Sequence, residues 1–207
     1  MQDVIHNFEE TTLPHLRAAY NLARWLTRND TDAEDVVQEA YLRALRHFGS
    51  FHGGDGRPWL LAIVRHTCYT WLRQNRAPEL QIAFDEEMYA RQVSDLNPET
   101  LLLREADSEL LKQALEKLPL EFREIIVMRE IEGLSYKQIA EVADIPRGTV
   151  MSRLARARKR LVRIVKGQGD KEIAEELAVA VSNEGCLAEY SLPQRHQFHV
   201  NEIFSSV

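Results

Sequence analysis

At 207 residues, 44% hydrophobic and 28% charged, with a formal net charge of −6, the chain is typical of a globular protein with one large or two small domains, not of a fibrous or disordered one. Its longest apolar run, residues 59–64, cannot span a membrane and no secretory signal opens it, so we expect a cytoplasmic protein without membrane insertion. Cys68 and Cys186 lack the spacing of a cysteine-based zinc site and are too few for a disulfide framework.

Nearly every periodic segment predicts helix, so the expected class is all-α, with two small helical domains joined by a flexible linker. The first clear helix covers residues 32–47, where apolar residues recur every three or four positions. The expected buried stripe comprises Val36, Val37, Ala40, Tyr41, Ala44 and Phe48. The outward face carries Asp35, Gln38, Glu39, Leu42 and Arg46. Thr31 or Asp32 is expected to cap the start of this helix.

A glycine-rich loop follows this helix, and Pro58 then suits the first turn of a second helix that continues to Arg76. This second helix contains no acidic residue, and aromatic residues are interspersed among its arginines. Beyond it the periodicity fades and acidic residues accumulate, and helical patterning returns near residue 101. We therefore divide the chain into a first domain (residues 1–77), an acidic linker (78–104), a second domain (105–167) and an acidic tail (168–207).

The second domain contains a predicted helix-turn-helix. Pro119 ends one helix, Gly133 marks a turn, and Ser135 with Gln138 predicts a capping box at the next helix start. After the short turn "ADIPRG", the last helix is expected to bury Val150, Leu154, Ala157, Leu161 and Ile164. Its opposite face carries Ser152, Arg156, Lys159 and Arg163, with Arg153 and Arg160 on the flanks.

The charge of this last helix suits a nucleic-acid partner. Residues 147–166 hold eight basic residues and no acid, whereas acids gather in the linker and the tail. A cationic amphipathic helix alone could equally face RNA, lipid or solvent. The capped first helix, the short turn and the second apolar stripe together favour duplex DNA, with arginine reading guanine and other cations neutralising phosphates.

Segments in both predicted domains resemble one known family. The segment "LPLEFREIIVMREIEGLSYKQIAEVADIPRGTVMSRLARARKRL" closely resembles the promoter-reading domain of the extracytoplasmic-function (ECF) group of bacterial RNA polymerase sigma factors. "DAEDVVQEAYLRAL" and "PWLLAIVRHTCYTWLRQNR" resemble the N-terminal domain of that group. The resemblance implies an alternative sigma factor that binds core RNA polymerase and promoter DNA and promotes DNA melting. It also implies an anti-sigma partner lodged between the domains, no cofactor and no catalytic activity.

The resemblance also assigns roles to individual residues. The polymerase-binding surface is expected at Asp35, Gln38, Glu39, Leu42 and Arg46, which without it would be read as ordinary solvated surface. The minus-ten element is expected to contact Arg65, His66, Tyr69, Trp71, Arg73 and Arg76, with the rings stacking on an unpaired base, although Trp71 could equally pack in the core. The minus-thirty-five element is expected to contact Arg147, Thr149, Met151, Ser152, Arg153, Arg156 and Lys159. His66 stands where many relatives carry Asn, and Met151 where a charged or polar residue is frequent, so base preference at both positions stays open.

Two other functions each account for part of the sequence. A stand-alone helix-turn-helix regulator explains the second domain but not the aromatic, acid-free helix of the first. An enzyme is conceivable if His47, His52 and His66 form a metal site. However, the sequence has neither the HExxH spacing nor the paired carboxylates that usually accompany such a site. The tail could fold over the basic helix, form a small docking helix or stay disordered, and Cys186, His196 and His199 are a weak metal motif.

Overall fold

The computed structural model describes residues 2–75 and 103–167. Arg76, nearly all of the predicted linker and the whole predicted tail lie outside the described residues. The hypotheses of a tail folded over the basic helix and of a metal motif at Cys186, His196 and His199 therefore concern residues that the structure does not describe.

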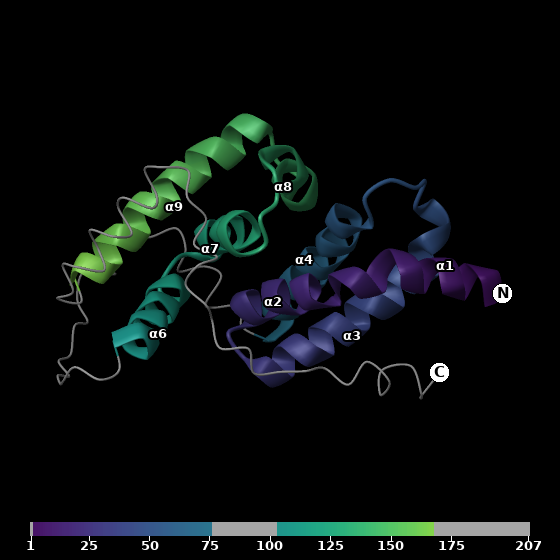
Figure 1. The fold of residues 1–207 in the computed structure, drawn as a ribbon, viewed down its shortest axis with the longest axis horizontal. Coiled ribbons are helices and arrows are strands. Elements are labelled where there is room, and N and C mark those ends of the chain that lie inside the picture. The colour runs from purple at the N-terminus through teal and green to yellow at the C-terminus, as the bar shows by residue number, and fades with distance from the viewer. Residues whose placement is uncertain (1, 76–102, 168–207) are drawn as a thin grey trace.

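The described residues form helices and no strand, which confirms the all-α class (Figure 1). The first domain consists of α1 (Gln2–Thr12), the short 3-10 helix η1 (Leu13–His15), α2 (Leu16–Thr27), α3 (Asp30–His47), the 3-10 helix η2 (Phe48–Ser50) and α4 (Gly56–Asn75). The second domain consists of α6 (Leu103–Glu116), α7 (Leu120–Ile126), the π-helical turn η5 (Val127–Ile131), α8 (Tyr136–Ala143) and α9 (Arg147–Gly167). None of these helices is both long and apolar enough to cross a membrane.

The core of the first domain lies where α2, α3 and α4 pack together. The predicted stripe of α3 is buried, except that Phe48 is only partly covered. Helix α1, which periodicity did not reveal, contributes the buried ring of Phe8, packed edge-on against Tyr41 and Phe48. The Tyr41 hydroxyl donates to the carbonyl oxygen of Thr12 at 3.0 Å, which ties the end of α1 to α3.

The cap of α3 differs from the prediction. Asn29, not Thr31 or Asp32, is the capping residue: its side-chain oxygen accepts from the backbone N–H of Asp32 at 3.0 Å. The helix begins at Asp30, so Thr31 and Asp32 already lie in its first turn. There the negative charges of Asp30 and Asp32 stabilise the positive end of the helix dipole.

The helix-turn-helix of the second domain is formed by α8 and α9. The predicted capping box is confirmed: the Ser135 hydroxyl accepts from the Gln138 N–H at 3.2 Å, and the Gln138 side chain accepts from the Ser135 N–H at 2.9 Å. Asp144 ends α8 in a left-handed conformation, with φ of 52°. The inner stripe of α9 is correct in its first four positions, but Val165 is the fully buried fifth residue and Ile164 is only partly covered. The 3.6-residue period carries the stripe to Val165, four residues after Leu161.

The two domains are in direct contact. Helix α4 packs against α8, and α2 packs against α7 and η5. In Figure 1 the second domain, coloured teal to green, lies against the blue helix α4 of the first. Helix α4 is therefore enclosed from two directions, by its own domain and by the second.

Candidate nucleic-acid interface

The outer face of α9 presents a continuous basic surface. Ser152, Arg156, Lys159 and Arg163 are exposed, while Arg153 and Arg160 on the flanks are partly covered, as predicted. Arg147 is also exposed, Thr149 is partly buried, and Met151 is 52% exposed. Because Met151 projects outward although it is apolar, it belongs to the basic surface and not to the core.

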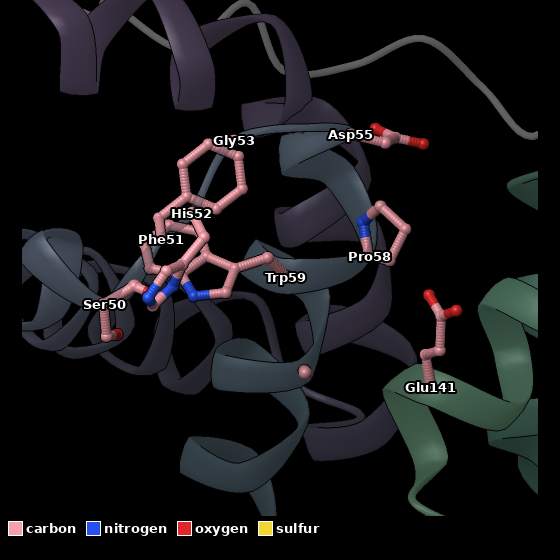
Figure 2. Close-up of a pocket in the computed structure, with 9 residues that line it drawn as sticks. Ser50, Phe51, His52, Gly53, Asp55, Pro58, Trp59 and Glu141 are labelled. Atoms are coloured by element: carbon pink, nitrogen blue, oxygen red, sulfur yellow. The ribbon is translucent and has the colours of Figure 1, made fainter.

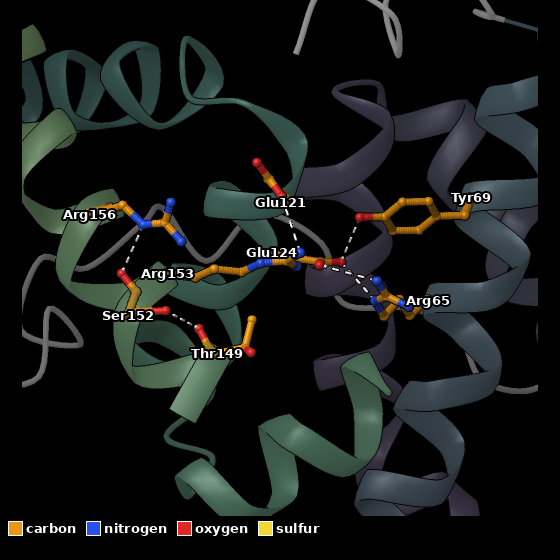
Figure 3. Close-up of polar contacts among 8 residues, drawn as sticks. All are labelled: Arg65, Tyr69, Glu121, Glu124, Thr149, Ser152, Arg153 and Arg156. Carbon is orange, nitrogen blue, oxygen red and sulfur yellow. Dashed lines mark hydrogen bonds and ion pairs between the residues drawn. The ribbon is translucent and has the colours of Figure 1, made fainter. Parts of the chain in front are cut away.

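Local contacts orient the side chains at the start of α9 (Figure 3). The Ser152 hydroxyl donates to the carbonyl oxygen of Thr149 at 3.1 Å. The Nε of Arg156 donates to the carbonyl oxygen of Ser152 at 3.3 Å, and its guanidinium lies 5.9 Å from the ring centre of Phe122. Arg153 pairs with Glu121 of α7 at 3.3 Å. The guanidinium of Arg156 is thus supported by the Phe122 ring, whereas Glu121 balances part of the positive charge of Arg153.

Arg158 is a basic residue of α9 with a different environment. Its Nε donates to Glu130 of η5 at 3.0 Å, with a second contact from the same guanidinium. The Glu130 side chain is 3% exposed and that of Arg158 is 14% exposed. Arg158 therefore anchors α9 to η5 and lies outside the basic surface.

The outward face of α3 is exposed as periodicity predicted. Asp35, Gln38 and Arg46 are exposed, and Glu39 is partly covered and accepts a hydrogen bond from Arg43 at 2.7 Å. Leu42 lies in their midst with 40% of its surface exposed. Leu42 is therefore an exposed apolar side chain on an otherwise polar face.

The structure divides the residues of α4 that were predicted to contact the minus-ten element. His66 and Arg73 are exposed to solvent, and Trp71 is partly buried against the core. Arg65 and Tyr69 instead face the second domain (Figure 3). Sequence periodicity gave no sign of this division.

Arg65 and Tyr69 both bond to Glu124 of α7, whose side chain is fully buried. The Nε and Nη2 of Arg65 donate to the two carboxylate oxygens of Glu124 at 2.8 and 3.2 Å. The Tyr69 hydroxyl donates to the first of these oxygens at 3.0 Å, and the Arg65 guanidinium lies 4.5 Å from the Tyr69 ring centre.

Electrostatics reinforce this arrangement. Burial by itself lowers the pKa of the Arg65 guanidinium, but hydrogen bonds and the charge of Glu124 outweigh it and raise that pKa. Burial, with the charge of Glu124 second, raises the pKa of the Tyr69 hydroxyl far above its ordinary value. Arg65 therefore stays charged and Tyr69 stays a hydrogen-bond donor.

A second set of contacts crosses the same boundary. The Nη2 of Arg57 donates to the backbone carbonyl and to the carboxylate of Glu132, both at 2.7 Å. Asn21 of α2 donates to the other carboxylate oxygen of Glu132 at 2.9 Å. The Gln138 side chain donates to the carboxylate of Asp55 at 2.8 Å. The Glu132 side chain is only 7% exposed, so this contact, like the Glu124 cluster, is largely shielded from water.

A pocket of about 380 Å³ lies beside these contacts, between the loop that follows η2, the start of α4, and α8 (Figure 2). The aromatic rings of Phe51 and Trp59 line it, 5.1 Å apart between centres. The Nδ1 of His52 donates to the carbonyl oxygen of Ser50 at 2.6 Å. Gly53 follows with a φ of 84°, a left-handed conformation that favours glycine. Sequence reasoning treated this segment only as a loop, although the aromatic residues that flank the glycines were a usable signal.

Glu141 of α8 also lines this pocket. Figure 2 shows its carboxylate approaching from the second domain, near Pro58. The pocket is therefore formed by both domains, and one of its walls is acidic.

No metal site is apparent in residues 2–75 and 103–167, where no three His, Cys, Asp or Glu side chains converge. His47, His52 and His66 are each exposed. These three histidines do not form the cluster that the enzyme hypothesis requires.

Residues 13–77 match the family model described as Sigma-70 region 2, and residues 108–161 match Sigma-70, region 4. The chain is 37% identical over 137 residues to the ECF RNA polymerase sigma-E factor of Escherichia coli K12, a match that covers 62% of this chain and 71% of that protein. It is 33% identical over 163 residues to the ECF RNA polymerase sigma factor SigE of Mycolicibacterium smegmatis. That match covers 77% of this chain and 62% of the mycobacterial protein, so the chain spans less than two thirds of that relative.

Two solved structures resemble the fold. The sigma factor RpoE in complex with the anti-sigma factor NepR from Bartonella quintana is 29% identical, with a TM-score of 0.59 over 77% of this chain and 97% of that one. CnrH in complex with the cytosolic domain of CnrY is 25% identical, with a TM-score of 0.54 over 77% of this chain and 88% of that one.

Proposed function

Because the chain belongs to the ECF family of RNA polymerase sigma factors, we propose that it binds core RNA polymerase and directs it to promoters that carry minus-thirty-five and minus-ten elements. It acts by binding and by promoting DNA melting, not by catalysis, and it works in the cytoplasm. Residues 1–77 form the domain for polymerase and the minus-ten element, and residues 105–167 the domain for the minus-thirty-five element. Residues 78–104 link them. An anti-sigma protein controls the chain, and the solved complex of the similar sigma factor RpoE with the anti-sigma factor NepR supports this part of the proposal.

The observation that carries this proposal is the basic surface of α9 behind a capped α8, within the region 4 match. In a helix-turn-helix the N-terminal part of the second helix meets base edges, and later cations meet phosphates. Arg147, Thr149, Met151, Ser152, Arg153, Arg156 and Lys159 therefore contact the minus-thirty-five element. Among them Arg156 is the best placed to read a guanine, since it is exposed and supported by the Phe122 ring.

The outward face of α3 binds core polymerase. Leu42 supplies apolar contact at its centre, and Asp35, Gln38, Glu39 and Arg46 surround it with polar groups. This arrangement of an apolar centre and a polar rim supports a protein contact more than a nucleic-acid contact.

The pocket beside Phe51 and Trp59 receives an unpaired base of the minus-ten element. Its aromatic rings offer stacking surfaces, and its volume of about 380 Å³ accommodates a nucleobase. His66, Trp71, Arg73 and Arg76 guide the adjoining strand along α4. Arg65 and Tyr69 join them only when the second domain has moved away, because both are held by Glu124 in the closed chain.

Transcription from a pool of promoter sequences by purified bacterial core polymerase, with and without the full chain, tests the proposal. New sequence-specific start sites are expected only when the chain is present. Leu42→Glu should abolish them while the circular dichroism spectrum stays unchanged, and Leu45→Ala, at a partly buried neighbour, serves as a control for general damage to α3.

A stand-alone regulator predicts the opposite result. It would bind a specific duplex without core polymerase and would add no start sites. Its weakness is the region 2 match over residues 13–77, which a helix-turn-helix repressor does not need.

A further inference from the structure

An apolar side chain projects from the basic surface of α9. We propose that, within the proposed function on which this inference rests, Met151 reads the 5-methyl group of a pyrimidine in the minus-thirty-five element. One position of the promoter is then recognised by its methyl group, while arginines of α9 read neighbouring bases by hydrogen bonds. The ligand of Met151 is a 5-methylated pyrimidine of duplex DNA, of which thymine is the ordinary form.

Met151 is exposed although a side chain of its size and polarity is more often buried. Among the side chains that the structure describes in the second domain, it is the one large apolar side chain that is exposed, at 52%. Val150 before it and Leu154 after it are buried in the core, so the exposure of Met151 follows from its position on a well-packed helix. A single exposed apolar side chain is common on protein surfaces, and the neighbours of Met151 therefore decide what it contacts.

Met151 shares its row of α9 with a small apolar residue. Residues four apart on a helix lie one above the other, which places Arg147, Met151 and Ala155 in one row, and all three are exposed. Arg158, the next cation on this side, is held by Glu130. Met151 and Ala155 thus form an apolar strip beside the cations of the basic surface.

The polar residue next to Met151 has already used its hydrogen. The Ser152 hydroxyl donates to the carbonyl oxygen of Thr149 at 3.1 Å (Figure 3). The guanidinium of Arg156, one turn further on, lies 5.9 Å from the ring centre of Phe122. A base opposite Met151 therefore meets an apolar group and not the hydroxyl hydrogen of its neighbour.

The major groove offers an apolar side chain a suitable partner. Met151 is the fifth residue of α9 and lies in the part of a helix-turn-helix that meets base edges. Base pairs present hydrogen-bonding groups there, and thymine adds its apolar 5-methyl group. Covering a hydrogen-bonding group with a thioether chain is costly, whereas a methyl group and a thioether chain both gain by leaving water. The unbranched methionine chain also adapts to the position of the methyl group.

Methyl reading can be distinguished from hydrogen-bond reading by four pyrimidines. Thymine and 5-methylcytosine carry the methyl group, and uracil and cytosine lack it. Thymine and uracil present an acceptor where cytosine and its methylated form present a donor. A methyl reader gains from the methyl group on either base, whereas a hydrogen-bond reader separates thymine and uracil from both cytosines.

The test uses core RNA polymerase with the full chain bound, on a promoter obtained from the transcription pool. In its minus-thirty-five element each thymine is replaced by uracil and each cytosine by 5-methylcytosine, one at a time, and dissociation constants are measured by competition. We expect one position at which the methyl group strengthens binding about fourfold, the factor for one buried methyl group. A cytosine placed at that position should gain by the same factor when it is methylated.

Two variants assign the effect to its residue. Met151→Gln keeps the length and the helix propensity of the side chain but removes its apolar end. With this variant the methyl factor should fall to about one, and binding to the uracil promoter should change little, because only the methyl contact is lost. Arg163→Gln, at an exposed cation further along α9, is the matched control. It should weaken binding to every duplex alike and leave the methyl factor unchanged.

Three results would overturn the methyl reading. The first is a minus-thirty-five element without a methyl-sensitive position, and the second is a methyl effect that survives in Met151→Gln. The third is equal weakening of all duplexes, or weaker binding of core polymerase, by Met151→Gln, which would place Met151 against a phosphate or a protein. If the chain adds no start sites with core polymerase, the proposed function falls as well; if it adds them, any of the three results removes the methyl reading alone.

Discussion

Replacing Glu130 by alanine should lower the free energy of unfolding of the second domain by about 3–5 kcal/mol, the usual cost of removing one partner of a buried ion pair. The Glu130 side chain is 3% exposed, and the guanidinium of Arg158 that it meets is 14% exposed. Arg158 lies on α9 and Glu130 on η5 of the same domain. The guanidinium therefore cannot return to water unless the packing of α9 is disrupted.

Glu124→Ala removes a carboxylate that is at least as buried, yet its effect on unfolding should be smaller. Its partner Arg65 belongs to the other domain, so the chain can separate its domains and return the guanidinium to water. The loss is then limited to the free energy of docking, and the unfolding of the second domain itself changes by about 0.5 kcal/mol or less, as at a surface position. The two substitutions should differ because the arginine that pairs with Glu130 lies in the same domain, whereas the arginine that pairs with Glu124 lies in the other domain.

Urea unfolding of the full chain, followed by circular dichroism, measures both losses, with Glu10→Ala as the exposed control. The slope of free energy against urea should stay constant in Glu130→Ala, since the surface exposed on unfolding is unchanged. A loss below about 1 kcal/mol, the range of surface pairs, would refute the assignment of Glu130 as a buried anchor. Equal losses for Glu124→Ala and Glu130→Ala would refute the idea that separating the domains relieves the first.

Ser135→Ala should lower stability by about 1 kcal/mol, measured by urea unfolding, because it removes the capping box of α8, and Ser135→Asp should restore most of it. Burial raises the pKa of the Cys68 thiol, so Cys68 stays protonated at neutral pH. In a Cys186→Ser variant, which removes the other thiol, a thiol reagent should react slowly with Cys68 and faster as the pH rises. Adding Glu124→Gln should speed the reaction further if it uncovers α4. Phe51→Ala should cost about 1–3 kcal/mol of base stacking, seen as weaker permanganate reactivity of melted promoter thymines at unchanged polymerase binding; unchanged melting would remove the pocket from the proposal.

Features set by near neighbours could be predicted from the sequence. The capping box needs only Ser135 and Gln138, three residues apart, and the outward face of α3 needs only the helical period. The predicted cap of α3 was wrong because several adjacent residues are equally suitable as helix caps. Thr31, Asp32 and Asn29 are all good caps, and only the position of the first turn chose Asn29.

Features set by distant parts of the chain could not be predicted in this way. Arg65 and Glu124 are 59 positions apart, and nothing near Arg65 distinguishes an arginine that faces another domain from one that faces DNA. Arg156 and Arg158 show the same limit two residues apart: one is exposed and the other is held by Glu130. The charge pattern of the sequence located the basic helix, but it could not distinguish the exposed arginines from those that pair with acids inside the protein.

The ion pairs between the domains also require that the arginines of the first domain meet acidic residues at the matching positions of the second. A hybrid that joins this first domain to a second domain without acids at the positions of Glu124 and Glu132 would have to bury Arg57 and Arg65 unpaired in order to close. In such a hybrid each domain would fold, but the two domains would not pack against each other. Exchanging second domains between relatives would therefore also change how readily the two domains close on each other.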